Sequence, residues 1–277
     1  MTGLGSISPF DYSGMASLTD LASPAWRTLF GELERSQSRF QAQHARILDA
    51  EYKWPRDPLH TWSRGWEYAY VAHHLGRAEG QDNRVIDFGC GVTFFPFFLA
   101  QSGFDVVGID NDPICERGMK RAIEAMGATP GSVSIQLSRD GRLDMPDDSV
   151  SAAYSVSVLE HIPTLEPILA ELARVMRPGA RFVLTIDVGL EPGQELDPDR
   201  YAIMRGALAK AFELVHAERT THPLDMLTTD TGPYPKYGSN DAVAWLRRKA
   251  KRTVRRVLDR RPWEYSLACA GFVLRRT

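Results

Sequence analysis

The sequence predicts an α/β fold built on a doubly wound, mainly parallel sheet, for which we expect seven strands. Apolar runs at residues 85–88 and 106–110 each carry an acidic residue near their end, and a helix-like stretch separates them. Further apolar runs at 132–137, 151–158 and 181–188 alternate with helical segments. Strands that alternate with helices are typical of a parallel sheet covered on both faces.

A glycine turn follows the first apolar run. Gly89 and Gly91 lack a Cβ, so the backbone there can pass close to a ligand. Asp110 ends the next run about 20 residues later, where an acid is placed to bind two ribose hydroxyls. Asp110 could instead cap the following helix, but Asp112 is the expected cap. The pattern therefore predicts a nucleotide-binding unit.

Two classes of nucleotide use such a unit. A dinucleotide needs its pyrophosphate on the helix N-terminus, which favours a third glycine, and Phe94 stands at that position. S-adenosylmethionine (SAM) has no phosphate, and its cationic sulfonium and amino-acid end suit an acidic strand end such as Asp87. The sequence therefore favours SAM over NAD.

Five motifs in order resemble those of the class I SAM-dependent methyltransferases, with a core similar to methyltransferase types 11 and 25. The first is Asp87-x-Gly89-x-Gly91, with Thr93 where the family often has a third glycine. The others are Arg139-Asp140-Gly141, Leu143-Asp144-Met145-Pro146-Asp147-Asp148-Ser149, Val158-Leu159-Glu160-His161-Ile162 and Glu171-Leu172-Ala173-Arg174-Val175-Met176-Arg177-Pro178-Gly179. This resemblance implies a Rossmann-like fold with an N-terminal helical cap and a C-terminal inserted lid.

The resemblance also implies SAM as the cofactor and assigns residues to it. The expected cofactor-binding residues are Asp87, Gly89, Cys90, Gly91, Asp110, Asn111, Asp140, Gly141, Ser155, Tyr68 and Arg64. Asp140 would lie beside the adenine, although Asp before Gly is also common in plain turns. Tyr68 and Arg64 precede the core, where the family often folds a helix over the cofactor, and packing is their alternative role.

His161 and Glu160 are the candidate catalytic residues. They follow the fourth strand of the unit at the carboxyl edge of the sheet, and imidazole can accept a proton near neutral pH. The alternative is that both residues brace the next helix, because many methyl transfers need only proximity and an in-line approach. Glu160 and His161 could also hold a divalent cation, but two adjacent ligands are thin support for one. His73 and His74 are adjacent on a helix and point apart, so no metal site is predicted.

Composition places the chain among ordinary globular proteins. Its 277 residues are 43% hydrophobic, which suffices for a substantial core, and the net charge of −2 gives no overall attraction to nucleic acid or membrane. The isolated Cys90, Cys115 and Cys269 form no disulfide or metal pattern. With no signal peptide and no membrane-spanning stretch, the expected location is cytoplasmic.

The chain is expected to divide at residues 1–81, 82–188 and 189–277: an arm with a helical cap, the SAM-binding core, and the rest of the fold with a substrate lid. Residues 1–24 read as a loose arm, and helices are expected over 26–48 and 63–75. A basic amphipathic helix over 241–261 carries Arg247, Arg248, Arg252 and Arg255. It is either a solvated face or a surface for a membrane or an anionic acceptor.

The predicted function is transfer of a methyl group from SAM to a hydroxyl or amine of a small molecule, such as a sugar or natural-product intermediate. An Asn-Pro-Pro-aromatic run, typical of nucleobase and protein-amide N-methyltransferases, is missing after the fourth strand. The alternatives are an RNA methyltransferase, although nucleic acid is not favoured, and a non-catalytic SAM-binding protein whose basic helix binds a partner. Neither the acceptor nor the oligomeric state can be read from the sequence.

Overall fold

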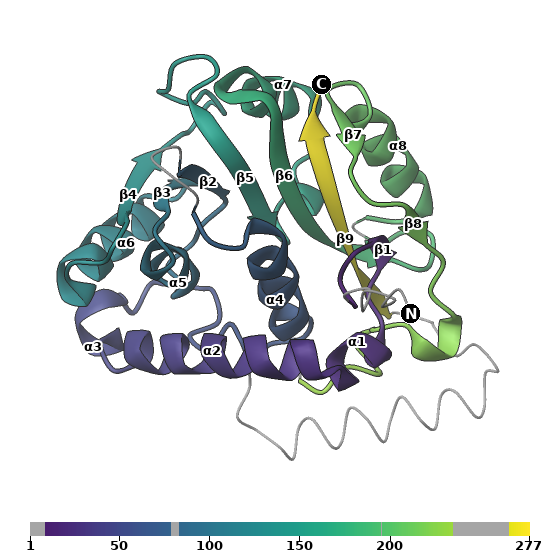
Figure 1. Ribbon diagram of the computed structural model, residues 1–277, viewed down its shortest axis with the longest axis horizontal. Coiled ribbons are helices and arrows are strands. Elements are labelled where there is room, and N and C mark those ends of the chain that lie inside the picture. Colours follow the sequence, from purple (N-terminus) through teal and green to yellow (C-terminus); the bar gives the residue numbers. More distant parts are fainter. Residues whose placement is uncertain (1–8, 79–82, 195, 235–265) are drawn as a thin grey trace, which may run out of the picture.

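The computed structural model describes residues 9–78, 83–194, 196–234 and 266–277, which form a sheet with helices on both faces (Figure 1). The strands are β1 (Ser13–Met15), β2 (Arg84–Phe88), β3 (Asp105–Asp110), β4 (Ser132–Leu137), β5 (Val150–Val156), β6 (Met176–Gly189), β7 (Phe212–Leu214), β8 (Glu218–Arg219) and β9 (Leu267–Arg276). The α-helices are α1 (Leu18–Ala22), α2 (Pro24–Gln41), α3 (His44–Ile47), α4 (Arg64–Leu75), α5 (Phe95–Gln101), α6 (Pro113–Met126), α7 (Glu166–Val175) and α8 (Pro198–Leu208). Two 3-10 turns are η1 (Leu159–His161) and η2 (Pro223–Asp225).

The strand order is β4-β3-β2-β5-β6-β9-β1-β8, with β7 also paired to β9. Strands β2 to β6 run parallel, and β9 runs antiparallel to β6. From β2 the chain moves outward through β3 to β4 and then returns to β5 on the other side of β2. In open parallel sheets, ligands bind outside the carboxyl ends of the strands at such a reversal. The strand order therefore makes the carboxyl ends of β2 and β5 the expected binding region.

The predicted fold class is confirmed, but the sheet has nine strands within the described residues rather than seven. The long strand β9 has an outer edge that one short strand cannot cover. Strand β7 pairs with its end near Arg276, and β1 pairs near Gly271. Strand β8 then adds to β1, so the N-terminal segment and the β7–β8 stretch extend the sheet.

Two apolar layers cover the sheet because neighbouring side chains on a strand point to opposite faces. Val85, Ala152 and Val183 belong to the layer beneath α4, α5 and α6. The alternate positions on the same strands belong to the layer beneath α7 and α8. Helix α2 runs along the lower edge of the sheet in Figure 1, where the carboxyl ends of the parallel strands lie. Helix α2 thus covers the carboxyl edge of the sheet.

The expectation of a loose arm at residues 1–24 is wrong for its described part, residues 9–24. Ser17 and Asp20 form a capping box that starts α1. The Asp20 side chain is 1% exposed, and its carboxylate accepts hydrogen bonds from the hydroxyl of Tyr12 (2.5 Å), Nε1 of Trp66 (3.0 Å) and both terminal nitrogens of Arg219 (3.1 Å each). These contacts bind the segment to α4 and to the added edge of the sheet.

Other local expectations also need correction. The helix predicted over 26–48 stops at Gln41 and resumes as the short α3, which packs against α6. The strand expected over 181–188 begins earlier, because β6 starts directly at Met176, next to a register shift opposite Val150. His74, on the helix expected over 63–75, is buried. Its Nε2 lies 2.9 Å from the Phe10 carbonyl oxygen, and its ring packs on Tyr70.

None of the helices in the described ranges combines the length and the hydropathy needed to cross a membrane. The basic helix expected over 241–261 and much of the expected lid lie outside the described residues. Their predicted roles stay predictions.

Candidate functional site

The glycine turn lies at the carboxyl end of β2. Gly89 has φ +79° and Gly91 φ +53°, a region that glycine adopts without the penalty of a side chain. A Cβ at Gly89 would stand 2.4 Å from the Val158 side chain, so no larger residue fits there. The amide of Gly91 donates to Oδ2 of Asp110 at 2.9 Å, which fixes the turn against the end of β3.

Asp110 and Asp112 divide two tasks that the sequence left open. Asp112 caps α6, because its side chain accepts from the amide of Ile114 at 2.8 Å. Asp110 instead accepts from the amides of Gly91 and Asp112, one at each carboxylate oxygen. Each oxygen keeps a second lone pair, so this half-buried, oriented carboxylate can still accept from a ligand hydroxyl. Asn111, beside it, is exposed.

Asp87 is buried on β2, two residues before Gly89. Burial raises the pKa of its carboxyl to about 8, the negative charge of Asp110 adds to the rise, and the Tyr154 hydroxyl opposes it. Tyr68 of α4 also lies near, because its hydroxyl and the Asp87 carboxyl interact electrostatically. Among the described residues no cation contributes to the pKa of this buried carboxyl, so it suits a positively charged ligand group.

Tyr52 is a site residue that the sequence analysis missed. It belongs to the segment between α3 and α4, and its buried hydroxyl accepts from the amide of Val92 at 3.1 Å. The same segment is bound to α6 by an ion pair between Asp49 and Arg121. The only sequence signal here was the helix break at Trp54-Pro55, which says nothing of where the segment folds.

A buried polar cluster lies at the end of β5. Glu67 of α4 is fully buried and accepts from the hydroxyls of Ser63 (2.8 Å) and Ser157 (2.7 Å) and from the guanidinium of Arg64. Arg64 also donates to the Ser157 hydroxyl. Ser157 has φ +49°, a conformation that is costly for a residue with a side chain and often found at functional sites. Arg64 was a predicted site residue, whereas Glu67 was not assigned to the cofactor.

Two further carboxyl groups, Glu160 and Asp187, adjoin this cluster. Glu160 is 1% exposed, and its Oε1 accepts from the amide of Asp187 at 3.0 Å. Its Oε2 has no hydrogen-bond partner within the described part of the chain. Asp187 accepts from Nε1 of Trp62 at 2.8 Å. Burial and the neighbouring Asp187 carboxylate raise the pKa of Glu160 well above its ordinary value. Protonation of Glu160 relieves the repulsion between the two carboxyl groups.

The remaining predicted residues are placed unequally. His161 is exposed on η1, directly after Glu160. Asp140 is exposed and accepts from the amide of Arg142 at 3.1 Å, and Gly141, at φ +78°, packs under Ile168. Ser155 is not brought to the site surface, because its buried hydroxyl donates to the Phe88 carbonyl at 2.9 Å. The Cys90 side chain is likewise buried, so only its backbone can meet a ligand.

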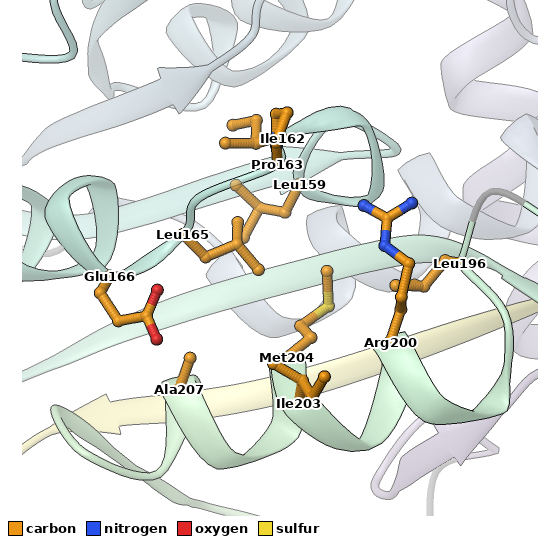
Figure 2. Close-up of a pocket in the computed structure, with 10 residues that line it drawn as sticks. All are labelled: Leu159, Ile162, Pro163, Leu165, Glu166, Leu196, Arg200, Ile203, Met204 and Ala207. Atoms are coloured by element: carbon orange, nitrogen blue, oxygen red, sulfur yellow. The ribbon is translucent and has the colours of Figure 1, made fainter.

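A groove of about 130 Å³ opens between η1 and α8 (Figure 2). Leu159, Leu165 and Met204 make it largely apolar, while Glu166 and Arg200 stand at its rim. It is small for a pocket that encloses a drug-sized ligand. It lies on the α7–α8 side of η1, and not at the glycine turn.

Comparison with known proteins agrees with this geometry. Residues 86–184 match the family model for a methyltransferase domain. A protein named as probable tocopherol O-methyltransferase from Oryza sativa subsp. japonica is 28% identical over 197 residues, 69% of this chain and 52% of that protein. Sterol 24-C-methyltransferase from Pneumocystis carinii (strain B80) is 28% identical over 190 residues, 61% and 47% of the two chains. The aligned region thus spans about half the length of these relatives.

Solved structures show the same fold at low identity. Geranyl diphosphate C-methyltransferase from Streptomyces coelicolor A3(2) aligns with a TM-score of 0.54 and 14% identity, over 92% of this chain and 99% of that one. A SAM-dependent methyltransferase from Aquifex aeolicus aligns with a TM-score of 0.52 and 14% identity, over 86% and 98%. The family match, the order of the motifs and the sheet topology agree: residues 86–184 match a methyltransferase domain, and the described residues share the fold of SAM-dependent methyltransferases.

Proposed function

We propose that the protein transfers a methyl group from SAM to a hydroxyl or amine of a small molecule. The observation that carries the proposal is the group formed by the Gly89–Gly91 turn, the oriented carboxylate of Asp110 and the buried carboxyl of Asp87. All three lie at the carboxyl ends of β2 and β3, next to the point where the strand order reverses between β2 and β5.

The residues present fit SAM. The two glycines adopt the positive φ that the turn requires, Asp110 can accept from ribose hydroxyls, and Asp87 can balance a cationic end. When bound, SAM would supply a methyl group on a sulfonium, which is already a good electrophile. The protein's part is then to hold the acceptor in line and to take its proton.

Replacing Asp110 by alanine should weaken SAM binding by about 1–3 kcal/mol, the cost of leaving polar groups of the ligand unpaired. Calorimetric titration of the full chain measures this. Asp112→Ala is the matched control, because it removes the cap of α6 and leaves the bond between Asp110 and Gly91. Wild-type protein that binds NAD and not SAM would overturn the assignment.

SAM affinity should rise with pH up to about 8 and then level off. The Asp87 carboxyl has its pKa raised to about 8, so it holds a proton at neutral pH, and pairing with a cation requires that proton to leave. Binding therefore releases a proton below this pH. Titrations at pH 7 in two buffers of different ionisation enthalpy should give heats that differ accordingly. Asp87→Asn should abolish this buffer dependence, and wild-type heats that are equal in both buffers would contradict the role given to Asp87.

For the acceptor we propose a neutral or cationic small molecule bound beside η1. Glu67 and Asp187 place two carboxylates near the guanidinium of Arg64, and protonated Glu160 adds no positive charge, so this arrangement disfavours an anionic acceptor. The relatives named for tocopherol and sterol methylation support a small, largely apolar acceptor. Formation of S-adenosylhomocysteine with panels of hydroxyl and amine compounds tests this directly.

The same assays separate the two alternatives. A non-catalytic SAM-binding protein would bind the cofactor but form no S-adenosylhomocysteine with any acceptor. An RNA methyltransferase would bind bulk RNA with an affinity that falls steeply with salt, because phosphate contacts release counterions. No observation in the described residues favours RNA over a small molecule.

A further inference from the structure

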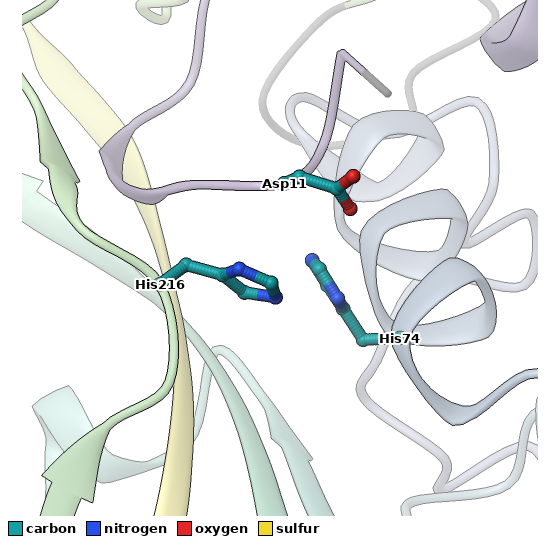
Figure 3. A group of neighbouring side chains, drawn as sticks. All are labelled: Asp11, His74 and His216. Atoms are coloured by element: carbon teal, nitrogen blue, oxygen red, sulfur yellow. The ribbon is translucent and has the colours of Figure 1, made fainter. Parts of the chain in front are cut away.

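We propose that Asp11, His74 and His216 form a site for a divalent transition-metal ion of the zinc type. The three side chains come from separate parts of the chain: the segment before β1, the end of α4, and the link between β7 and β8. Figure 3 shows them pointing toward one another. This proposal is independent of the proposed function.

The geometry is that of a nearly assembled ligand set. One ligand atom from each residue lies within 4.8 Å of the others. Tetrahedral zinc with bonds of 2.0–2.1 Å places its ligands about 3.4 Å apart, so the set must draw in by about an ångström. His74 is 5% exposed and fixed, whereas Asp11 is exposed and His216 is half-buried. The two outer side chains have the freedom to make that movement.

Hydrogen bonds behind two of the three side chains, His74 and Asp11, orient them as metal ligands require. Nε2 of His74 lies 2.9 Å from the carbonyl oxygen of Phe10. A carbonyl can only accept, so Nε2 carries the hydrogen and Nδ1 keeps its lone pair. Metal-binding histidines commonly donate their other ring N–H to a backbone carbonyl in this way. His73 holds Oδ1 of Asp11 at 3.0 Å, which steadies the carboxylate and leaves Oδ2 available.

The donor set decides the kind of ion. Two imidazoles and one carboxylate suit Zn²⁺ and its neighbours, whereas Ca²⁺ and Mg²⁺ prefer oxygen ligands alone. Three protein ligands leave a fourth position for water. The proposed ion is thus borderline-soft, four-coordinate and reached from solvent on the Asp11 side.

The position of the site indicates a structural role. His74 stands ten residues after Arg64 on α4, about 15 Å along the helix axis, and so away from the polar cluster at the end of β5. Beside the site, the amide of Ser13 donates to the Ala217 carbonyl at 3.1 Å. The N-terminal segment and the β7–β8 link are therefore already joined there by backbone. A metal ion would fasten both to α4 and strengthen the attachment of the N-terminal cap.

Titration of the full, tag-free chain with zinc chloride and cobalt chloride tests the site. We expect one equivalent of Zn²⁺ to bind and Co²⁺ to give the strong visible absorption of a tetrahedral nitrogen–oxygen site. Asp11→Asn and His216→Gln should each weaken Zn²⁺ binding at least tenfold, in line with the loss of a ligand. Both residues lie toward the surface, so these variants should fold even if a substitution of buried His74 does not.

His44→Gln is the matched control. His44 packs on Phe40, and among the described residues it belongs to no group of three possible metal ligands. It should bind Zn²⁺ like the wild type. Absence of a stoichiometric Zn²⁺ site in the wild type, or equal binding by the wild type and both ligand variants, would overturn the proposal. Weaker Zn²⁺ binding by Asp11→Asn and His216→Gln, with wild-type binding by His44→Gln, would support it.

Discussion

Replacing His161 by glutamine is expected to lower the turnover number by about 10²–10⁴-fold while SAM affinity stays nearly unchanged. The imidazole is exposed on η1, next to the buried carboxyl of Glu160 and at the carboxyl edge of β5. A general base at this position would act on the acceptor's proton and not on the cofactor. Loss of a general base that acts only on the acceptor should lower kcat. SAM affinity should stay the same, because Asp87 and Asp110 are the residues proposed to bind the cofactor.

The measurement is steady-state methyl transfer to an identified acceptor, together with calorimetric SAM binding. His222→Gln is a matched control, because His222 is also exposed but only caps the η2 turn through its ring nitrogen and the amide of Leu224. It should keep the wild-type rate. An undiminished rate in His161→Gln would give His161 a bracing role, with proximity as the main source of catalysis.

Replacing Asp20 by alanine is expected to reduce the free energy of unfolding by about 3–5 kcal/mol. Asp20 is 1% exposed, and its loss leaves the Tyr12 hydroxyl and the Trp66 indole without their acceptor, at about 1–3 kcal/mol for each buried group. Arg219 also loses its carboxylate, but its side chain is 34% exposed, so water offsets much of that loss.

Urea unfolding followed by tryptophan fluorescence measures the change. Asp225→Ala is the comparison, because Asp225 accepts from the amide and hydroxyl of Thr19 in an exposed setting. It should cost about 1 kcal/mol or less. If Asp20→Ala were no more destabilising than Asp225→Ala, the N-terminal segment would not be held by this network.

The sequence by itself determined the core of the protein. The apolar runs predicted β2 to β6, and β4 was placed at its observed bounds, because buried parallel strands are continuous apolar segments. The glycine turn, Asp110 and the capping role of Asp112 were also readable, since each depends on neighbours close in the chain. The family match over residues 86–184 covers the same region.

Contacts between distant residues were decided only by the tertiary structure. Arg64 and Glu67 are three residues apart on one helix, but their meeting with Ser157, 93 residues beyond Arg64, depends on how α4 packs over β5. The burial of Asp20 depends on Arg219, 199 residues later, so residues 9–24 look like a polar arm in sequence and are an anchored edge in the fold. His74 and His216 likewise meet only because β7, β8 and the N-terminal segment extend the sheet beside α4. Local pattern fixes which segments become strands and helices, whereas long-range packing fixes which polar side chains share one buried space.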